Sequence, residues 1–326
     1  NSQIGGRRNM IVNGGMQVAQ RGTSETGMGA ADGYFTVDRF AMAFSGTAGR
    51  LTMTQEDITD LSSFPHALKL ACTTADTSIA AGEYLLLQYK FEGQDVQQLK
   101  KNTSDAEQFT ISFYVKGNAN ATYTLEVKDN TNGRNNSQNF NVTTSWNRVS
   151  LTFAADTAGS SLINNDNSLE FFFQIWLHAG STYNGGTFAS NTWIDQVQNK
   201  RSDSSSTSFF DSTDRTFFIT GVQMEVGSQA TPFEHRSFGE ELALCQRYYY
   251  KEAETRSLLV YQEGSVFLQD NHYFPMAMRT SPTATLGNTH ANAGSVSSTL
   301  IANISTTSCI VAINTASTGA RIQYSN

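Results

Sequence analysis

The sequence predicts an all-β protein, in which a jelly-roll β-sandwich is followed by a short connector helix and a smaller C-terminal β domain. Three observations lead to this fold class. Charged residues make up only 16% of the chain, and the Ser, Thr, Asn and Gly that replace them favour strands and turns. Apolar residues alternate with period two in several runs, as in half-buried strands. Helical periodicity is clear in a single short segment near residue 240.

The runs of period two define the predicted sandwich. They cover residues 109–116, 123–127, 149–153, 169–178 and 217–226, with turns rich in Asn, Gly, Asp and Ser between them. Many short strands at this spacing are typical of a sandwich of two antiparallel sheets. We therefore expect two packed sheets over residues 100–227, with one inward residue of each run in the core: Phe113, Leu125, Leu151, Phe173 and Val222.

A helix is expected directly after the sandwich. Ser237 can cap it, Glu240 follows three residues later as in a capping box, and Leu242 and Cys245 form the apolar stripe that packs on the jelly roll. The predicted domains are residues 1–236 for the N-terminal segment plus jelly roll, 237–252 for the helix and 253–326 for the C-terminal β domain. Strands are expected in the last domain at 257–269, 273–278, 283–286, 309–313 and 321–324.

The charge pattern excludes several classes of partner. The formal net charge is −7 and Lys and Arg form no block, so neither a nucleic acid nor an anionic membrane surface is an expected partner. Membrane insertion is not expected either, because no apolar run reaches the length of a membrane span. The chain opens with Asn1, which we interpret as a fragment or processed product without its anchoring parts. The three cysteines are too few for a disulfide framework and are expected as buried free thiols.

Three patches carry a resemblance to a known family. They are Asn-Met-Ile-Val-Asn-Gly-Gly-Met-Gln-Val-Ala-Gln-Arg-Gly-Thr-Ser at 9–24 with Asp-Arg-Phe at 38–40, Thr-Gly-Val-Gln-Met-Glu-Val-Gly at 220–227 running into Ala-Thr-Pro-Phe-Glu-His-Arg-Ser-Phe at 230–238, and Glu-Glu-Leu-Ala-Leu-Cys-Gln-Arg-Tyr-Tyr-Tyr at 240–250. Together they resemble bacteriophage tail-fibre and tail-tip proteins. The middle of the chain is similar in pattern to jelly-roll carbohydrate-binding modules.

The resemblance implies a role outside the cell. It implies a virion subunit of the tail or a fibre, made in the bacterial host cytoplasm, that associates with other virion tail proteins, forms a homotrimer and attaches to a host surface polysaccharide. An architectural virion protein, such as a head fibre or a decoration protein without a ligand, is the alternative. A polysaccharide depolymerase domain is a third.

The residues themselves do not predict an enzyme. The sequence has no phosphate loop or nucleophile elbow, and its five histidines are isolated. A depolymerase works with a pair of carboxylates. The nearest candidates for such a pair are Glu170, Asp195, Asp211 and Asp214, and no motif joins them.

A glycan site is predicted on the polar side of the run at 169–178. Trp176 lies there between Gln174 and His178, and Tyr114 and Lys116 occupy the corresponding side of their own run. A flat ring among polar groups is what a sugar requires. The alternative is that Trp176 is covered by the N-terminal segment or a neighbouring subunit. In that case the next choice is the C-terminal domain, around Tyr261, His272 and Tyr273.

No cofactor is expected, and a structural Ca²⁺ is a weak possibility. Asp156 and Asp166 supply oxygen ligands in neighbouring turns, although their spacing fits no defined Ca²⁺ motif, and plain turns are the alternative. Two ionic clusters are interpreted as scaffolding: Arg21 with Asp38 and Arg39, and residues 234–236 with the two glutamates of the predicted helix.

Overall fold

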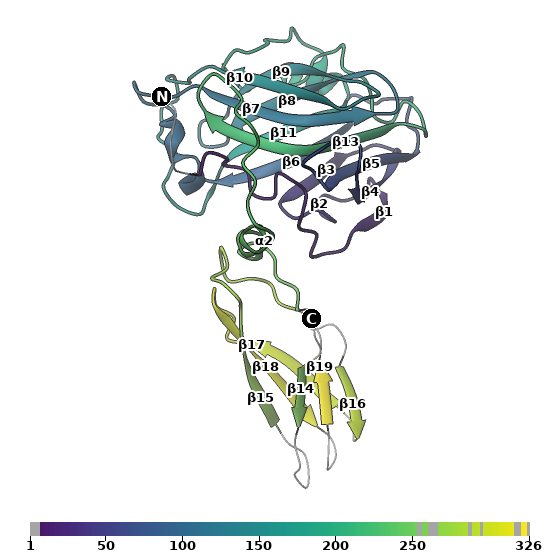
Figure 1. The fold of residues 1–326 in the computed structure, drawn as a ribbon, viewed down its shortest axis with the longest axis vertical. Helices are drawn as coiled ribbons and strands as arrows, with labels where there is room; N and C mark the ends of the chain where they lie inside the picture. Colours follow the sequence, from purple (N-terminus) through teal and green to yellow (C-terminus); the bar gives the residue numbers. More distant parts are fainter. Residues whose placement is uncertain are drawn as a thin grey trace. The chain divides into compact units, whose positions relative to one another are not determined.

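The computed structural model describes residues 7–252, 256–259, 267–285, 289–293, 296–315 and 321–324. The chain forms two compact units, Asn1–Glu241 and Leu242–Asn326. The boundary between them falls inside helix α2 (Phe238–Gln246), which Figure 1 shows in green. Of the helices in the described ranges, none is long and apolar enough to cross a membrane.

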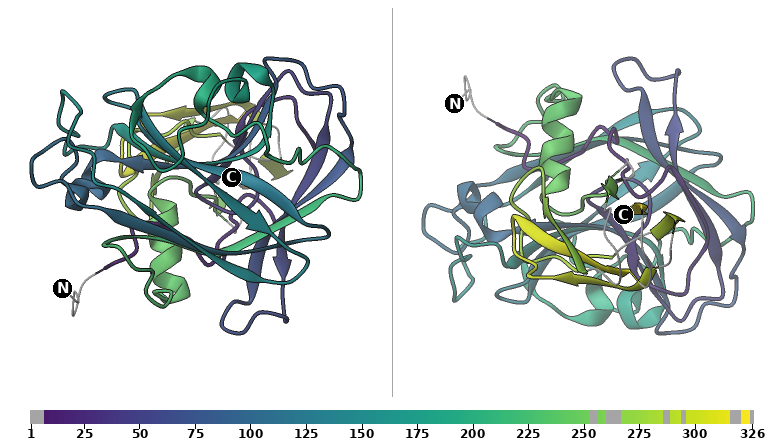
Figure 2. Two further views of the ribbon diagram at one scale, coloured as in Figure 1. Left: turned by 90° about the horizontal axis from the view of Figure 1, so that it is seen from above. Right: turned by 90° about the horizontal axis from the view of Figure 1, so that it is seen from below.

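The N-terminal unit is a jelly-roll sandwich of two antiparallel sheets, as predicted (Figures 1 and 2). Sheet A contains, in spatial order, β1 (Ser24–Met28), β4 (Arg50–Asp57), β5 (His66–Thr74), β13 (Thr216–Val226), β7 (Phe109–Gly117) and β10 (Asn147–Phe153). Sheet B contains β12 (Ile194–Asp195), β9 (Arg134–Val142), β8 (Ala121–Asp129), β11 (Leu169–Ala179), β6 (Tyr84–Glu92), β3 (Phe40–Ser45) and β2 (Gly33–Tyr34). The loops of this unit carry the short helices η1 (Gly93–Asp95), η2 (Gln97–Leu99), α1 (Ser181–Asn184) and η3 (Gln198–Lys200).

The predicted core is confirmed. Phe113, Leu125, Phe173 and Val222 are fully buried between the sheets, and Leu151 is half-buried against them. The sandwich is wider than the predicted span of 100–227, because strands β1 to β6 complete both sheets. The sequence interpretation missed the three long strands β4, β5 and β6.

The first two patches that carry the family resemblance meet the first residues of the third patch, Glu240 and Glu241, in the N-terminal unit. Asn9 Nδ2 donates to the carbonyl of Val222 at 3.2 Å, and the backbone amide of Asn13 donates to Glu241 Oε2 at 2.7 Å. A Cβ on Gly14 would lie 2.0 Å from the oxygen of Val222, so this close approach requires glycine. The patches therefore form a clamp that fixes the first residues onto the sandwich.

Both ionic clusters contribute to the same clamp. Arg21 pairs with the buried Asp38 at 3.1 Å, and Arg236 pairs with Glu241 at 3.4 Å while it donates to the carbonyl of Ile11 at 3.0 Å. The third expected member, Arg39, lies over the ring of Tyr89 and donates to a backbone carbonyl. Their interpretation as scaffolding agrees with these contacts.

Helix α2 is shorter than expected. Ser237 Oγ accepts from the amide of Glu240 at 3.3 Å, which confirms the predicted cap. The helix ends at Gln246, six residues before the expected 252, and the chain continues in an irregular segment. Cys245 is buried and Leu242 is half-buried. The three cysteines are free and buried, as predicted.

The C-terminal unit contains two small antiparallel sheets. One is formed by β14 (Arg256–Leu259), β19 (Arg321–Tyr324) and β16 (Thr289–Ala293), and the other by β15 (Phe267–Tyr273), β18 (Ser308–Thr315) and β17 (Val296–Ala302). Strands were expected at 273–278 and 283–286, but residues 274–285 form neither strand nor helix, so the prediction is wrong there. Pro275 and Pro282 lie in this stretch and lack the amide that a central strand needs. Residue 286 lies outside the described residues.

Candidate functional site

The predicted open face around Trp176 is closed. Trp176 is 1% exposed, and its Nε1 donates to Glu126 Oε2 at 2.9 Å. The guanidinium of Arg201 lies over the ring at 4.7 Å and also donates to Gln174 Oε1 at 3.0 Å. The expectation of an exposed stacking ring is therefore wrong. The cover is the segment 181–208 and not the N-terminal segment, and it also buries Gln174 and His178.

Tyr114 and Lys116 are placed far from this face. They lie on β7 of sheet A, whereas Trp176 lies on β11 of sheet B, and all three alternate with residues that point into the shared core. Their side chains therefore leave the sandwich on opposite outer faces and cannot form one site with Trp176. Lys116 lies over the rings of Trp146 and Phe218, each at 4.9 Å.

The remaining candidates are scattered, and most of them are held by partners. Asp195 and Asp211 pair with Arg134 and Arg215, Glu170 accepts from an asparagine amide, and Asp214 is exposed in a turn. The Ca²⁺ candidate Asp156 is buried with Lys101 Nζ at 2.6 Å and Arg134 Nε at 3.0 Å. Because two side-chain cations already bind this carboxylate, Asp156 is not placed to bind Ca²⁺, and its prediction as a Ca²⁺ ligand is wrong. Asp166 accepts the amide of Ser168 in an exposed turn, so the plain-turn alternative is the better description.

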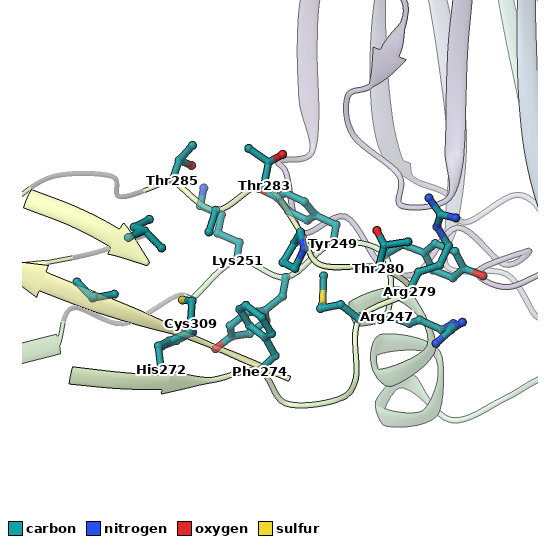
Figure 3. Close-up of a pocket in the computed structure, with 17 residues that line it drawn as sticks. Arg247, Tyr249, Lys251, His272, Phe274, Arg279, Thr280, Thr283, Thr285 and Cys309 are labelled. Carbon is teal, nitrogen blue, oxygen red and sulfur yellow. The ribbon is translucent and has the colours of Figure 1, made fainter. Parts of the chain in front are cut away.

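The C-terminal unit contains a cavity of about 290 Å³ (Figure 3). Its walls come from the irregular segments at 247–251 and 278–285 and from strands β15, β17 and β18. The apolar part of the lining includes Met278, Ile301, Cys309 and Val311. A volume of this order suits a small ligand or one or two sugar units.

Aromatic rings form a large part of the lining. Tyr250 stacks on His272 with ring centroids 5.9 Å apart, and Phe274 meets both rings edge-on. His272 Nδ1 lies 3.4 Å from Glu252 Oε2. These contacts make a rigid aromatic wall, while Tyr248 and Tyr249 add two half-buried rings.

The cavity is also basic. Arg247, Lys251 and Arg279 line it, which is three of the five Lys and Arg residues in 242–326. None of its seventeen described lining residues is a carboxylic acid. The amide of Arg279 donates to the carbonyl of Arg247 at 2.8 Å, so the two arginines start from adjacent backbone. Figure 3 shows Lys251 together with Tyr249 and Thr283 on another part of the wall.

The alternative location in the C-terminal domain named three residues, and the structure places one of them in the lining of this cavity. His272 lines the cavity. Tyr273 is 69% exposed and is not part of the lining, because neighbouring residues of β15 face opposite sides. Tyr261 lies outside the described residues.

The sequence interpretation missed the tyrosines at 248–250 as part of a site, because it placed them within the predicted helix at 237–252 and took Tyr248 or Tyr249 as part of the helix's apolar stripe. Three consecutive tyrosines cannot all share one face of a helix. Their position between Arg247 and Lys251 is the feature of the sequence that points to a binding surface rather than a helix.

Comparisons with known proteins find weak similarity of fold. No family model matches the chain, and no curated protein does. Similar solved structures include a family 11 carbohydrate-binding module from Clostridium thermocellum in complex with a mixed-linked tetrasaccharide (TM-score 0.31, 9% identity, 64% of this chain and 98% of that one). Another is the N-terminal cellulose-binding domain of a Cellulomonas fimi β-1,4-glucanase (TM-score 0.27, 14% identity, 58% and 90%). A third is TmCBM61 in complex with β-1,4-galactotriose (TM-score 0.33, 9% identity, 68% and 99%). At such low TM-scores and identities, these structures do not identify a ligand for this chain.

Proposed function

We propose that this chain is a non-catalytic subunit of a bacteriophage fibre that binds an acidic glycan of the host surface through the cavity of its C-terminal unit. The observation that carries the proposal is the composition of the cavity, which combines stacked rings with three basic side chains and no lining acid. Rings pack on the C–H faces of sugars, and Arg and Lys bind carboxylate or phosphate groups. The proposed ligand is therefore a glycan with uronic acid or phosphate groups.

The virion role rests on the resemblance of the three patches to tail-fibre and tail-tip proteins. In such a role the jelly-roll unit is a scaffold, since the clamp fixes its first residues and the outer surface around Trp176 is covered by the chain itself. The resemblance also supports a homotrimer among other virion tail proteins, in which three equal cavities raise the effective affinity by avidity. The virion is then the place where the chain works.

The two alternatives make different demands on the molecule. An architectural head fibre or decoration protein needs no ligand, and the ring-lined basic cavity then has no role. A depolymerase needs two carboxylates beside the bound sugar. None of the four candidate acids lines the proposed glycan cavity, and Asp195 and Asp211 each pair with an arginine elsewhere, which favours binding over cleavage.

A glycan array probed with the intact chain tests the proposal. We expect retention on acidic glycans and little on neutral ones, and we expect Lys251→Gln and Tyr249→Ala each to lower the retention at least tenfold. Tyr273→Ala is the matched control, because it removes an exposed ring of the same unit outside the cavity. Equal retention by all four proteins, or retention by none, would contradict the proposal.

A further inference from the structure

A second cluster with site-like chemistry lies in the jelly-roll unit, away from the glycan cavity. Asp76, Glu83 and His178 are all buried, and one ligand-type atom from each lies within 4.8 Å of the others. Asp76 and Glu83 come from the loop between β5 and β6, and His178 comes from the end of β11. The loop that connects β5 of sheet A to β6 of sheet B therefore supplies the two carboxylates, and the end of β11 in sheet B supplies the histidine.

Two atoms of the cluster have no hydrogen-bond partner. Glu83 Oε2 and His178 Nε2 are both buried and unsatisfied, and they lie 3.5 Å apart. His178 is only 2% exposed. Buried polar atoms without a hydrogen bond are uncommon and costly, so these two facing atoms have the capacity to bind one further group together.

The backbone around the cluster is held firmly. The amide of Asp76 donates to the carbonyl of Phe210 at 2.8 Å, and the amide of Gly180 donates to the carbonyl of Glu83 at 2.8 Å. These bonds join the β5–β6 loop to the segments that follow β11. The cluster is thus a preformed arrangement rather than a chance approach of mobile side chains.

The outer hydrogen bonds also orient two of the three side chains. His178 Nδ1 shares a hydrogen bond of 2.8 Å with Ser208 Oγ, which turns Nε2 toward Glu83. One oxygen of Asp76 accepts from Thr47 Oγ1 and from the amide of Ala48, each at 2.8 Å. Metal ligands are oriented by second contacts of this kind.

The two carboxylates of the cluster are not already paired with a side-chain cation of lysine or arginine. In the described part of the chain, neither Asp76 nor Glu83 has a Lys or Arg nitrogen within ion-pair distance. Both carboxylates are therefore placed where a divalent cation can bind them.

We propose that Asp76, Glu83 and His178 bind one divalent transition-metal ion of the zinc type. Two metal–ligand bonds of about 2.0–2.1 Å at the tetrahedral angle put their ligand atoms about 3.3 Å apart. The observed 3.5 Å between Glu83 Oε2 and His178 Nε2 is close to this distance between two zinc ligands. A mixed set of one imidazole and two carboxylates favours zinc over calcium, which takes six or more oxygens.

A cavity of about 130 Å³ lies beside His178 and is lined by Ser206 and Ser208 among others. It borders the Nδ1 side of the imidazole, where Ser208 binds, and Asp76 and Glu83 do not line it. The ion would lock the β5–β6 loop to the end of β11, so its role is structural.

The intact chain, freed of metal with a chelator, is titrated with zinc chloride by calorimetry. We expect one zinc ion per chain and a rise in the melting temperature. Glu83→Gln, which keeps the shape and removes the charge, and His178→Gln are each expected to weaken binding at least tenfold. His66→Gln is the control, since His66 pairs with the exposed Asp57 at 2.8 Å.

X-ray absorption at the zinc edge gives a second readout, with mixed nitrogen and oxygen ligands expected at about 2.0–2.1 Å. The absence of stoichiometric zinc uptake by the wild-type chain would overturn the proposal, because a proton shared by His178 and Glu83 would then fill the gap. Zinc binding that both Glu83→Gln and His178→Gln leave unchanged would overturn it as well.

Discussion

Trp176→Ala is expected to destabilise the jelly-roll unit by about 3–5 kcal/mol, the range for a large buried aromatic residue. The ring is 1% exposed and meets Tyr84 and Tyr183 at centroid distances of 6.1 and 5.2 Å. Its loss also removes the Nε1 donor from Glu126 Oε2. Urea unfolding followed by circular dichroism measures the difference.

The control for this prediction is Trp176→Phe, which keeps an aromatic ring and removes the donor. It is expected to cost less than the alanine variant, because Arg201 still donates to both oxygens of Glu126 at 2.9 and 2.8 Å. Below its melting temperature, Trp176→Ala should bind glycan like the wild type. A nearly unchanged stability together with lost glycan binding would restore Trp176 as the ligand site.

Lys101→Met is expected to cost about 3–5 kcal/mol, as when one partner of a buried ion pair is removed. Lys101 is almost fully buried, and its Nζ lies 2.8 Å from Asp129 Oδ2 and 2.6 Å from Asp156 Oδ2. It also lies 4.2 Å from the centre of the Trp193 ring. Asp156 keeps Arg134, but Asp129 is left as a buried charge without its cation. Adding Asp129→Asn to the variant should recover part of the loss.

The ion pair between Lys101 and Asp129 also predicts how the stability of the folded chain depends on pH. Burial acts to raise the pKa of Asp129, but the charge and hydrogen bond of Lys101 prevail and hold it below the ordinary value. A depressed pKa in the folded state gives stability that is complete above the unfolded value of about 3.9 and is lost as the pH falls through the folded value. The wild type should therefore lose stability below about pH 4. If the Lys101→Met variant lost as much stability below about pH 4 as the wild type, the assignment of this pH dependence to the Lys101–Asp129 pair would be wrong.

The sequence predicted the sandwich because the core alternates cleanly along each strand. Phe113 and Phe173 both face inward and both lie in runs of period two. A covered Trp176 was only the alternative, and the segment that covers it was not predicted, since Gln174 beside Trp176 is polar and resembles a surface position. The partner that satisfies Gln174 is Arg201, which returns through a separate segment. A buried polar network of this kind leaves no periodicity in the sequence.

The sequence did not predict either of the two candidate sites, and the reasons are related. The glycan cavity is made by irregular segments at 247–251 and 278–285, where local patterns favoured a helix and strands. The cluster of Asp76, Glu83 and His178 joins residues about a hundred positions apart. Neither arrangement has a fixed spacing, so only the folded chain brings its members together. The exception is the run of tyrosines between Arg247 and Lys251, which is visible in the sequence.

Calorimetric titration of the intact chain with an acidic oligosaccharide tests the central claim most directly, when the sugar is recovered afterwards and its mass is measured. We predict one saturable binding event per chain and recovery of the sugar at its original length. Lys251→Gln should weaken the affinity at least tenfold, which corresponds to about 1.4 kcal/mol, and Tyr273→Ala should not change it. Unchanged affinity in Lys251→Gln would contradict the cavity as the site, and a shortened sugar would contradict the claim that the chain binds its glycan without cleaving it.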